Sequence, residues 1–149
     1  MRIALFEPDI AGNVGTILRL GACLGVPVDL IEPMGFPWGD RALQRAGMDY
    51  VDQVDVVRHA DWDAFRIATP ERLVLATTRG STPLWDARFE PGDVLVMGSE
   101  GAGAPERVHA AAGLRVAIPM RPGARSLNVA VAAAMIAGEM MRQARAAAP

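Results

Sequence analysis

Short apolar runs alternate with longer stretches of helical spacing along the whole chain. The apolar runs have the length and residue types of buried strands and lie near Arg2–Phe6, Val28–Ile31, Val54–Val57, Arg72–Thr77, Asp93–Met97 and Leu114–Ile118. Helices are expected near Val14–Leu24, Arg41–Ala46, Trp62–Ala68, Pro105–Ala111 and Leu127–Ala146. This alternation predicts an α/β fold with a parallel sheet. No linker or repeat divides the 149 residues, so a single domain over 1–149 is expected.

The last helical stretch is rich in small residues. Ala130, Ala133, Ala134, Ala137 and Gly138 recur at spacings of three and four, which predicts a smooth ridge that permits close helix packing. Two interpretations stay open at this point. The ridge packs inside the monomer, or it forms the interface of a homodimer.

Composition excludes several classes of protein. The single cysteine, Cys23, excludes an intrachain disulfide framework, and with only two histidines no metal site is expected. The most apolar run, Val129–Gly138, is shorter than the roughly 20 residues that span a bilayer. No basic segment precedes a long apolar stretch at the N-terminus. We therefore expect a cytoplasmic protein with no membrane partner.

Charge leaves a nucleic-acid partner open. The net charge of −2 is a weak argument against one. All fifteen basic residues are arginines, the residue better suited to bidentate phosphate contacts. A coding bias that replaces lysine by arginine explains the same count.

Three glycine-containing loops each follow a predicted strand and precede a predicted helix. Ligands of open α/β sheets bind at the carboxyl ends of strands, so these loops are the expected walls of a site. In the first loop, Asn13 is placed to cap the helix, and Arg19 is either solvated or clamps a phosphate or ribose.

The second loop, 98–103, has the spacing Gly-x-x-Gly-x-Gly, which differs from the dinucleotide-binding fingerprint. Glu100 within it would repel phosphate and favours a ligand with a positive group or hydroxyls. The third loop, 118–128, contains two prolines and a glycine, which force an irregular path, and Ser126 is a candidate N-cap for the last helix.

Taken in order, the three loops resemble the three signature motifs of the SPOUT methyltransferase superfamily. The motifs are Asn13-x-Gly15-x3-Arg19, then Gly98-x-Glu100-x2-Gly103, then Ile118-Pro119-Met120 followed by Ser126-Leu127-Asn128. The stretches 30–36 and 46–50 resemble the TrmL (YibK-like) branch, whose members methylate the wobble nucleotide (position 34) of tRNA. The resemblance covers nearly the whole chain.

The resemblance implies an S-adenosylmethionine (SAM)-dependent RNA 2′-O-methyltransferase with a deep C-terminal trefoil knot and a homodimeric assembly. Its substrate would be a wobble pyrimidine in the tRNA anticodon loop. Asn13 and Arg19 would face the target ribose. The residues that would bind SAM are Ala76, Thr77, Gly98, Glu100, Gly103, Ile118, Met120, Ser126, Leu127 and Asn128.

Arg19 is expected to fix a phosphate and to stabilise developing alkoxide charge, because arginine stays protonated and cannot act as the base. Arg41 and Arg45, one helical turn apart, are expected to contact RNA phosphates, although a solvated helix face explains them equally. Two positions depart from the branch pattern. Ala102 stands where a basic residue is usual, and Ala130 where a hydroxyl or amide residue is common.

Three alternatives remain at this stage. The enzyme could methylate another tRNA or rRNA position. A nucleotide-binding oxidoreductase is a second possibility, since Glu32 ends the second strand as a ribose-binding acid would. A non-catalytic RNA-binding module on the same fold is the third, and the joint presence of Asn13, Arg19, Glu100, Ser126 and Asn128 argues against it.

Overall fold

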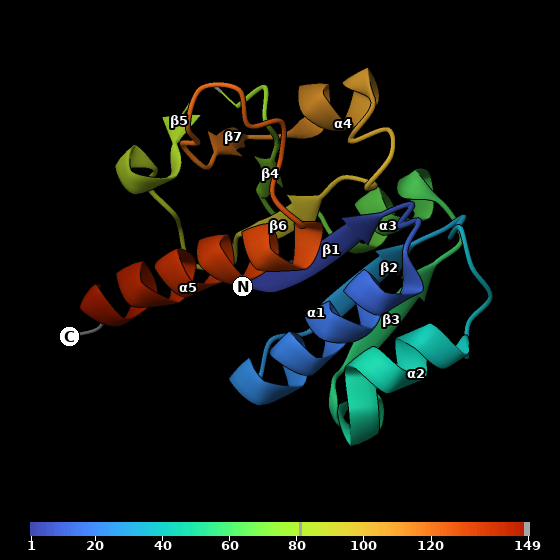
Figure 1. Cartoon of the computed structure of the whole chain (residues 1–149). Coiled ribbons are helices and arrows are strands. Elements are labelled where there is room, and N and C mark those ends of the chain that lie inside the picture. Colours follow the sequence, from blue (N-terminus) through green and yellow to red (C-terminus); the bar gives the residue numbers. More distant parts are fainter. Residues whose placement is uncertain (81, 148–149) are drawn as a thin grey trace.

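In a computed structural model that describes residues 1–80 and 82–147, seven strands form one parallel sheet (Figure 1). The strand order is β3-β2-β1-β6-β4-β7-β5. The strands are β1 (Arg2–Phe6), β2 (Val28–Ile31), β3 (Val56–His59), β4 (Leu73–Ala76), β5 (Thr82–Pro83), β6 (Val94–Met97) and β7 (Leu114–Ala117). The predicted α/β fold with a parallel sheet is confirmed. The single domain over 1–149 stays a prediction.

Helices cover both faces of this sheet (Figure 1). They are α1 (Ala11–Leu24), α2 (Arg41–Gly47), α3 (Trp62–Ala68), α4 (Glu106–Ala111) and α5 (Val129–Ala146), with two short 3-10 helices, η1 (Met48–Gln53) and η2 (Leu84–Asp86). In β1, Ile3 and Leu5 belong to the core beneath α1 and α5, whereas Ala4 and Phe6 belong to the core beneath α3 and α4. Burial on both faces explains why the four central strands β2, β1, β6 and β4 are nearly continuous apolar runs.

Three elements begin two or three residues away from their predicted starts: β3, α1, and α5, which begins at Val129 and not at Leu127. β3 covers Val56–His59 and not 54–57, because the polar His59 is buried, with its Nε2 atom 2.8 Å from Oδ1 of Asp29. Arg2 Nε donates to the other oxygen of that carboxylate at 2.7 Å, so the buried Asp29 is paired. Helix α1 begins at Ala11, three residues before the predicted Val14.

Close packing between α1 and α2 depends on Gly15. A Cβ atom at this position would lie 2.4 Å from the carbonyl oxygen of Leu43 and 2.8 Å from the Cβ of Ala46. The glycine of the first motif is therefore required by the fold. It lets α2 pack directly against α1.

The small-residue ridge of α5 divides between two environments. Ala130, Ala133 and Ala137 are at most 6 % exposed and pack in the core beneath α5. Ala134 and Gly138 are exposed on the opposite side of the helix. The inner part of the ridge thus packs inside the monomer, and Ala137 is not available to a partner subunit.

Candidate functional site

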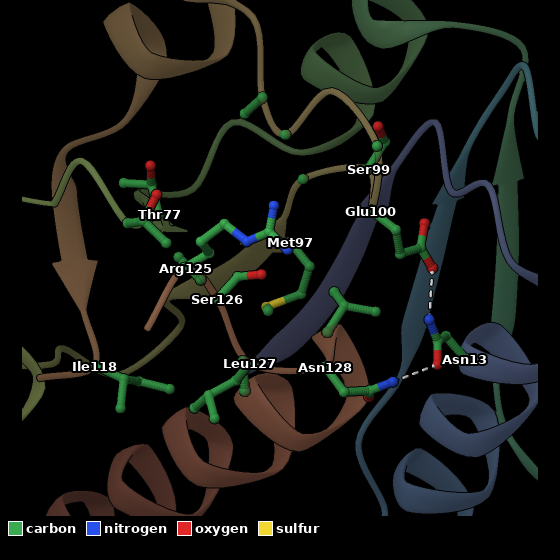
Figure 2. A pocket seen from close by; sticks show the side chains of 18 of the residues that line it. Asn13, Thr77, Met97, Ser99, Glu100, Ile118, Arg125, Ser126, Leu127 and Asn128 are labelled. Carbon is green, nitrogen blue, oxygen red and sulfur yellow. Dashed lines mark hydrogen bonds between the residues drawn. The ribbon is translucent and has the colours of Figure 1, made fainter. Parts of the chain in front are cut away.

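A cavity of about 560 Å³ lies at the carboxyl ends of β4, β6 and β7. Its walls come from the start of α1, the loop after β4, the loop after β6, and the long segment between β7 and α5 (Figure 2). Met97, Val116 and Ile136 contribute apolar surface. The cavity therefore lies where open parallel sheets bind ligands, and it has the size of a small-molecule site.

All ten residues predicted to bind the cofactor line this cavity. They are Ala76, Thr77, Gly98, Glu100, Gly103, Ile118, Met120, Ser126, Leu127 and Asn128. Asn13 also lines it. The structure thus brings together residues from four separate segments, and their contact with a cofactor stays a prediction.

The three predicted arginines lie outside the cavity. Arg19 is exposed further along α1, and its guanidinium carbon lies 5.4 Å from the centre of the Tyr50 ring. Arg41 and Arg45 line a separate surface hollow with Gln44 on α2. Contact of these arginines with RNA stays a prediction.

A chain of hydrogen bonds connects the three loops. Glu100 Oε1 accepts from Asn13 Nδ2 at 3.1 Å, and its Oε2 accepts from the backbone N–H of Asp9 at 2.8 Å. Asn13 Oδ1 in turn accepts from Asn128 Nδ2 at 2.9 Å (Figure 2). Glu100 was expected to favour a ligand with a positive group or hydroxyls, but both its oxygens accept hydrogen bonds from the first loop. Its main structural role is to hold that loop and the Asn13 amide.

Two predicted helix caps are wrong. The N-cap of α1 is Ile10, which makes no side-chain cap hydrogen bond, and Asn13 lies inside the first helical turn. The N-cap of α5 is Asn128 and not Ser126, because Asn128 directly precedes the helix and its Oδ1 accepts from the N–H groups of residues 130 and 131 at 2.8 and 3.2 Å. Asn13 is therefore held by Glu100 and Asn128, which lie far along the chain. Asn128 is held by Asn13 and by the backbone at the start of α5.

The second loop needs its glycines for backbone reasons. Ser99 and Gly103 form an antiparallel bridge, with N–H to O distances of 3.1 and 2.9 Å. Gly103 has a φ of +69°, and a Cβ atom at Gly98 would lie 2.7 Å from the carbonyl carbon of Gly103. Ala102 is exposed at the edge of this loop, and its backbone N–H donates to Ser99 Oγ at 3.2 Å. The contribution of Ala102 to this loop is therefore made by its backbone and not by its side chain.

The third loop turns sharply before it enters the cavity. The carbonyl of Arg121 accepts from the N–H of Ala124 at 3.1 Å, and Gly123 has a φ of +87°. Pro122 followed by glycine with positive φ is the arrangement of a type II turn. The turn is followed by Arg125, whose side chain points into the cavity (Figure 2).

The sequence interpretation missed Arg125, together with Thr78, Ser99 and the apolar wall. Arg125 directly precedes Ser126, the first residue in the second half of the third motif, but is not itself part of the motif. The Pro-Gly turn was the one available signal, since it predicts that the following residues reverse toward the strand ends.

Three further observations concern metal-binding groups, membrane-spanning helices and the oxidoreductase alternative. Within residues 1–80 and 82–147, no group of three or more histidine, cysteine or carboxylate side chains is placed to hold a metal ion. None of the described helices is both long and apolar enough to cross a membrane. Glu32, the acid of the oxidoreductase alternative, accepts from Arg58 Nε at 2.8 Å and does not line the cavity.

A model of the SpoU rRNA methylase family matches residues 1–138. The chain belongs to this family. It is 58 % identical over 144 residues to a tRNA (cytidine(34)-2′-O)-methyltransferase of Beijerinckia indica, a match that covers 95 % of this chain and 90 % of the relative. The prediction of an RNA methyltransferase is confirmed, and these similarities give the oxidoreductase alternative no support.

Solved structures agree with this assignment. A structure described as giving insights into the 2-OH methylation of C/U34 on tRNA superimposes with a TM-score of 0.93 at 40 % identity, covering 97 % of this chain and 96 % of that one. An rRNA methyltransferase from Sinorhizobium meliloti with bound AdoMet superimposes with a TM-score of 0.85 at 28 % identity. That match covers 95 % of this chain and 55 % of the longer Sinorhizobium meliloti chain.

Proposed function

We propose that this protein transfers a methyl group from SAM to the ribose 2′-oxygen of the wobble nucleotide of tRNA, a pyrimidine at position 34. One observation carries the proposal. The three motif loops converge on a single cavity in a chain that is 58 % identical to a methyltransferase named for that reaction. The alternative, methylation of another tRNA or rRNA position, uses the same chemistry on a different substrate.

SAM fits the residues that line the cavity. A relative with the same fold was solved with AdoMet bound. Ile118, Met120 and Leu127 offer apolar contacts to an adenosyl group, and the glycines at 98 and 103 let backbone amides approach it closely. SAM supplies an electrophilic methyl group, and the residues of the chain position the acceptor.

Asn13 and Arg19 would position that acceptor. They lie six residues apart on α1, and Asn13 is fixed by Glu100 and Asn128 at the edge of the cavity. The guanidinium of Arg19 would bind the phosphate next to the target ribose and stabilise negative charge as the 2′-oxygen attacks. The proton of the 2′-hydroxyl would leave to water or to a phosphate oxygen, because a protonated arginine cannot accept it.

Arg41 and Arg45 would contribute phosphate contacts in the anticodon loop. They line one exposed hollow on α2, the helix that packs on α1. Unpaired loops are the usual targets of sequence-specific RNA binding because their bases can be splayed out. A tRNA-modifying role would place the protein in the cytoplasm.

A homodimer would cover the apolar rim of the cavity. Ile10, Leu127 and Val131 are 50 %, 40 % and 49 % exposed, and the first two line the cavity itself. In this assembly the outer side of α5, with Ala134 and Gly138, would face the partner. We expect Val131→Glu to give monomers in analytical ultracentrifugation with the fold retained, and a wild-type protein that sediments as a monomer would contradict the assembly.

The C-terminal segment would form a trefoil knot. β4 lies between β6 and β7, and α5 returns to pack on β4 and β6. Gln143 near the end of α5 donates to the carbonyl of Ala87 at 2.9 Å and accepts from the N–H of Phe89 at 3.1 Å, which attaches the helix to the connection before β6. A crystal structure in which the segment after β7 does not pass through the preceding loop would contradict the knot.

Two measurements test the function together. Calorimetric titration should show binding of S-adenosylhomocysteine (SAH) and no binding of NAD. Nucleoside mass spectrometry should show loss of the 2′-O-methyl group at the wobble position in tRNA from a strain that lacks the gene, and restoration by the purified enzyme. Normal wobble methylation in that strain, or methylation by the enzyme of ribosomal RNA alone, would contradict the substrate assignment.

A further inference from the structure

Arg125 has an unusual position for an arginine of this chain. Among the residues that the structure describes, it is the only basic side chain that lines the cavity. Figure 2 shows its side chain directed from the third loop toward Met97, in the middle of the cavity and on the side of Thr77. The described part of the chain gives its guanidinium no acidic partner and no hydrogen bond, unlike the paired Arg2, Arg58 and Arg72. A cation placed in this way indicates an anionic group on the ligand.

Glu100, the only carboxylate among the described residues that line the cavity, does not compensate this charge. Both oxygens of Glu100 accept hydrogen bonds from the first loop, at 3.1 Å from Asn13 and at 2.8 Å from Asp9. Arg125 also lies on the opposite side of the cavity from Asn13 (Figure 2). Its charge is therefore available on the side of the cavity away from the proposed ribose position.

We propose that Arg125 pairs with the α-carboxylate of the methionine part of SAM. The inference rests on the proposed function and names the group of the methyl donor that this residue binds. A guanidinium and a carboxylate form paired, charge-assisted hydrogen bonds, which add orientation as well as affinity. Holding that carboxylate fixes the methionine end of the donor, and thereby the direction of the sulfonium methyl group. It does not change the reactivity of the methyl group.

The type II turn supports the pairing by positioning Arg125. Pro122 and Gly123 reverse the chain immediately before it, and Ser126 and Leu127 on its other side line the same cavity. Arg121 begins that turn and is exposed, as Arg125 is, but it does not line the cavity. Arg121→Gln is therefore a matched control, with the same charge change in the same loop.

A comparison of two ligands tests the pairing. SAH carries the carboxylate, and its decarboxylated analogue S-adenosyl-3-thiopropylamine keeps the adenosyl and amino groups without it. We expect Arg125→Gln to weaken SAH binding about tenfold or more, as loss of a charge-assisted pair does in a partly open site. The same variant should change the affinity for the decarboxylated analogue less than twofold. Arg125→Lys should recover part of the SAH affinity, and Arg121→Gln should leave both affinities unchanged.

Other outcomes separate the two proposals. Equal losses for both ligands in Arg125→Gln, or an unchanged SAH affinity with a raised KM for tRNA, would overturn the carboxylate pairing and leave the methyltransferase assignment standing. Failure of the wild-type protein to bind SAH would overturn the proposed cofactor, and the pairing with it.

Discussion

Asn128 donates a hydrogen bond from Nδ2 to Oδ1 of Asn13 over 2.9 Å, although the two residues are 115 positions apart. Asn128 caps α5, and Asn13 lies in the first turn of α1. The contact therefore joins the starts of the two helices that cover one face of the sheet. Through Glu100 it also joins the loop after β6, so the proposed acceptor site and the proposed donor site share one hydrogen-bonded frame.

The two functions of Asn128 can be separated by substitution. Asn128→Asp keeps an oxygen that caps α5, and a negative charge suits a helix N-terminus. The same substitution removes the Nδ2 group that donates a hydrogen bond to Oδ1 of Asn13. We expect a free energy of unfolding within about 0.5 kcal/mol of wild type together with a roughly tenfold lower kcat. Asn128→Ala, which also loses the cap, should cost about 1 kcal/mol of stability. Unchanged kcat in Asn128→Asp would show that the contact has no catalytic consequence.

Arg19→Ala should abolish methyl transfer and leave the Kd for SAH nearly unchanged. Arg19 lies outside the cavity, beside Tyr50, so its loss removes no contact with the donor. Single-turnover methylation and calorimetry measure the two effects. Arg45→Ala is the control for simple loss of positive charge and should raise the KM for tRNA more than it lowers kcat. A folded Arg19→Ala protein that no longer binds SAH would contradict this division of labour.

Sequence patterns predicted the centre of the sheet well because β1, β2, β4 and β6 are buried on both faces and are nearly continuous apolar runs. They missed β5, since two residues, Thr82 and Pro83, are too short to show any period. They misplaced the start of β3 because His59 is buried through its pairing with Asp29, a contact between residues 30 positions apart.

The site shows the same limit. Residues of the motifs could be named one by one, but local sequence assigned the caps to Asn13 and Ser126. The actual partners of Asn13 come from two distant loops, and local propensity contains no information about them. Likewise, the sequence did not show which alanines of α5 are buried. Ala133 and Ala137 are buried and Ala134 is exposed because of the way α5 packs on the sheet.

Gly15→Ala should destabilise the protein by roughly 1–3 kcal/mol, because the added methyl group would collide with the backbone of α2. Gly12→Ala, in the same helix with nothing within 4 Å of the added atom, should be neutral or stabilising by about 0.5–1 kcal/mol. Urea denaturation of both variants measures the difference. Equal stability of the two would contradict the close α1–α2 packing.

The stability contributed by Glu139 should depend on pH. Hydrogen bonds from Arg142 and Gln143 lower the pKa of Glu139 to about 2 from an ordinary value of 4.5. A carboxyl group with a lowered pKa stabilises the folded state above its unfolded pKa, and this contribution is lost as the pH falls toward 2. Glu139→Gln should therefore have a lower urea midpoint than wild type at pH 6. Near pH 2 the midpoints of the two proteins should be nearly equal. A difference in midpoint that is the same at both pH values would show that the charge of Glu139 contributes nothing.

The central claim, methylation of the 2′-oxygen at position 34, is tested most directly with two tRNAs that differ in one atom. Both are assembled by ligation with a synthetic anticodon arm, one carrying cytidine at position 34 and the other 2′-deoxycytidine. With SAM labelled in its methyl group, the account predicts incorporation of label into the first tRNA, recovered as 2′-O-methylcytidine after digestion, and none into the second. Equal incorporation into both tRNAs would place the methyl group elsewhere and contradict the account.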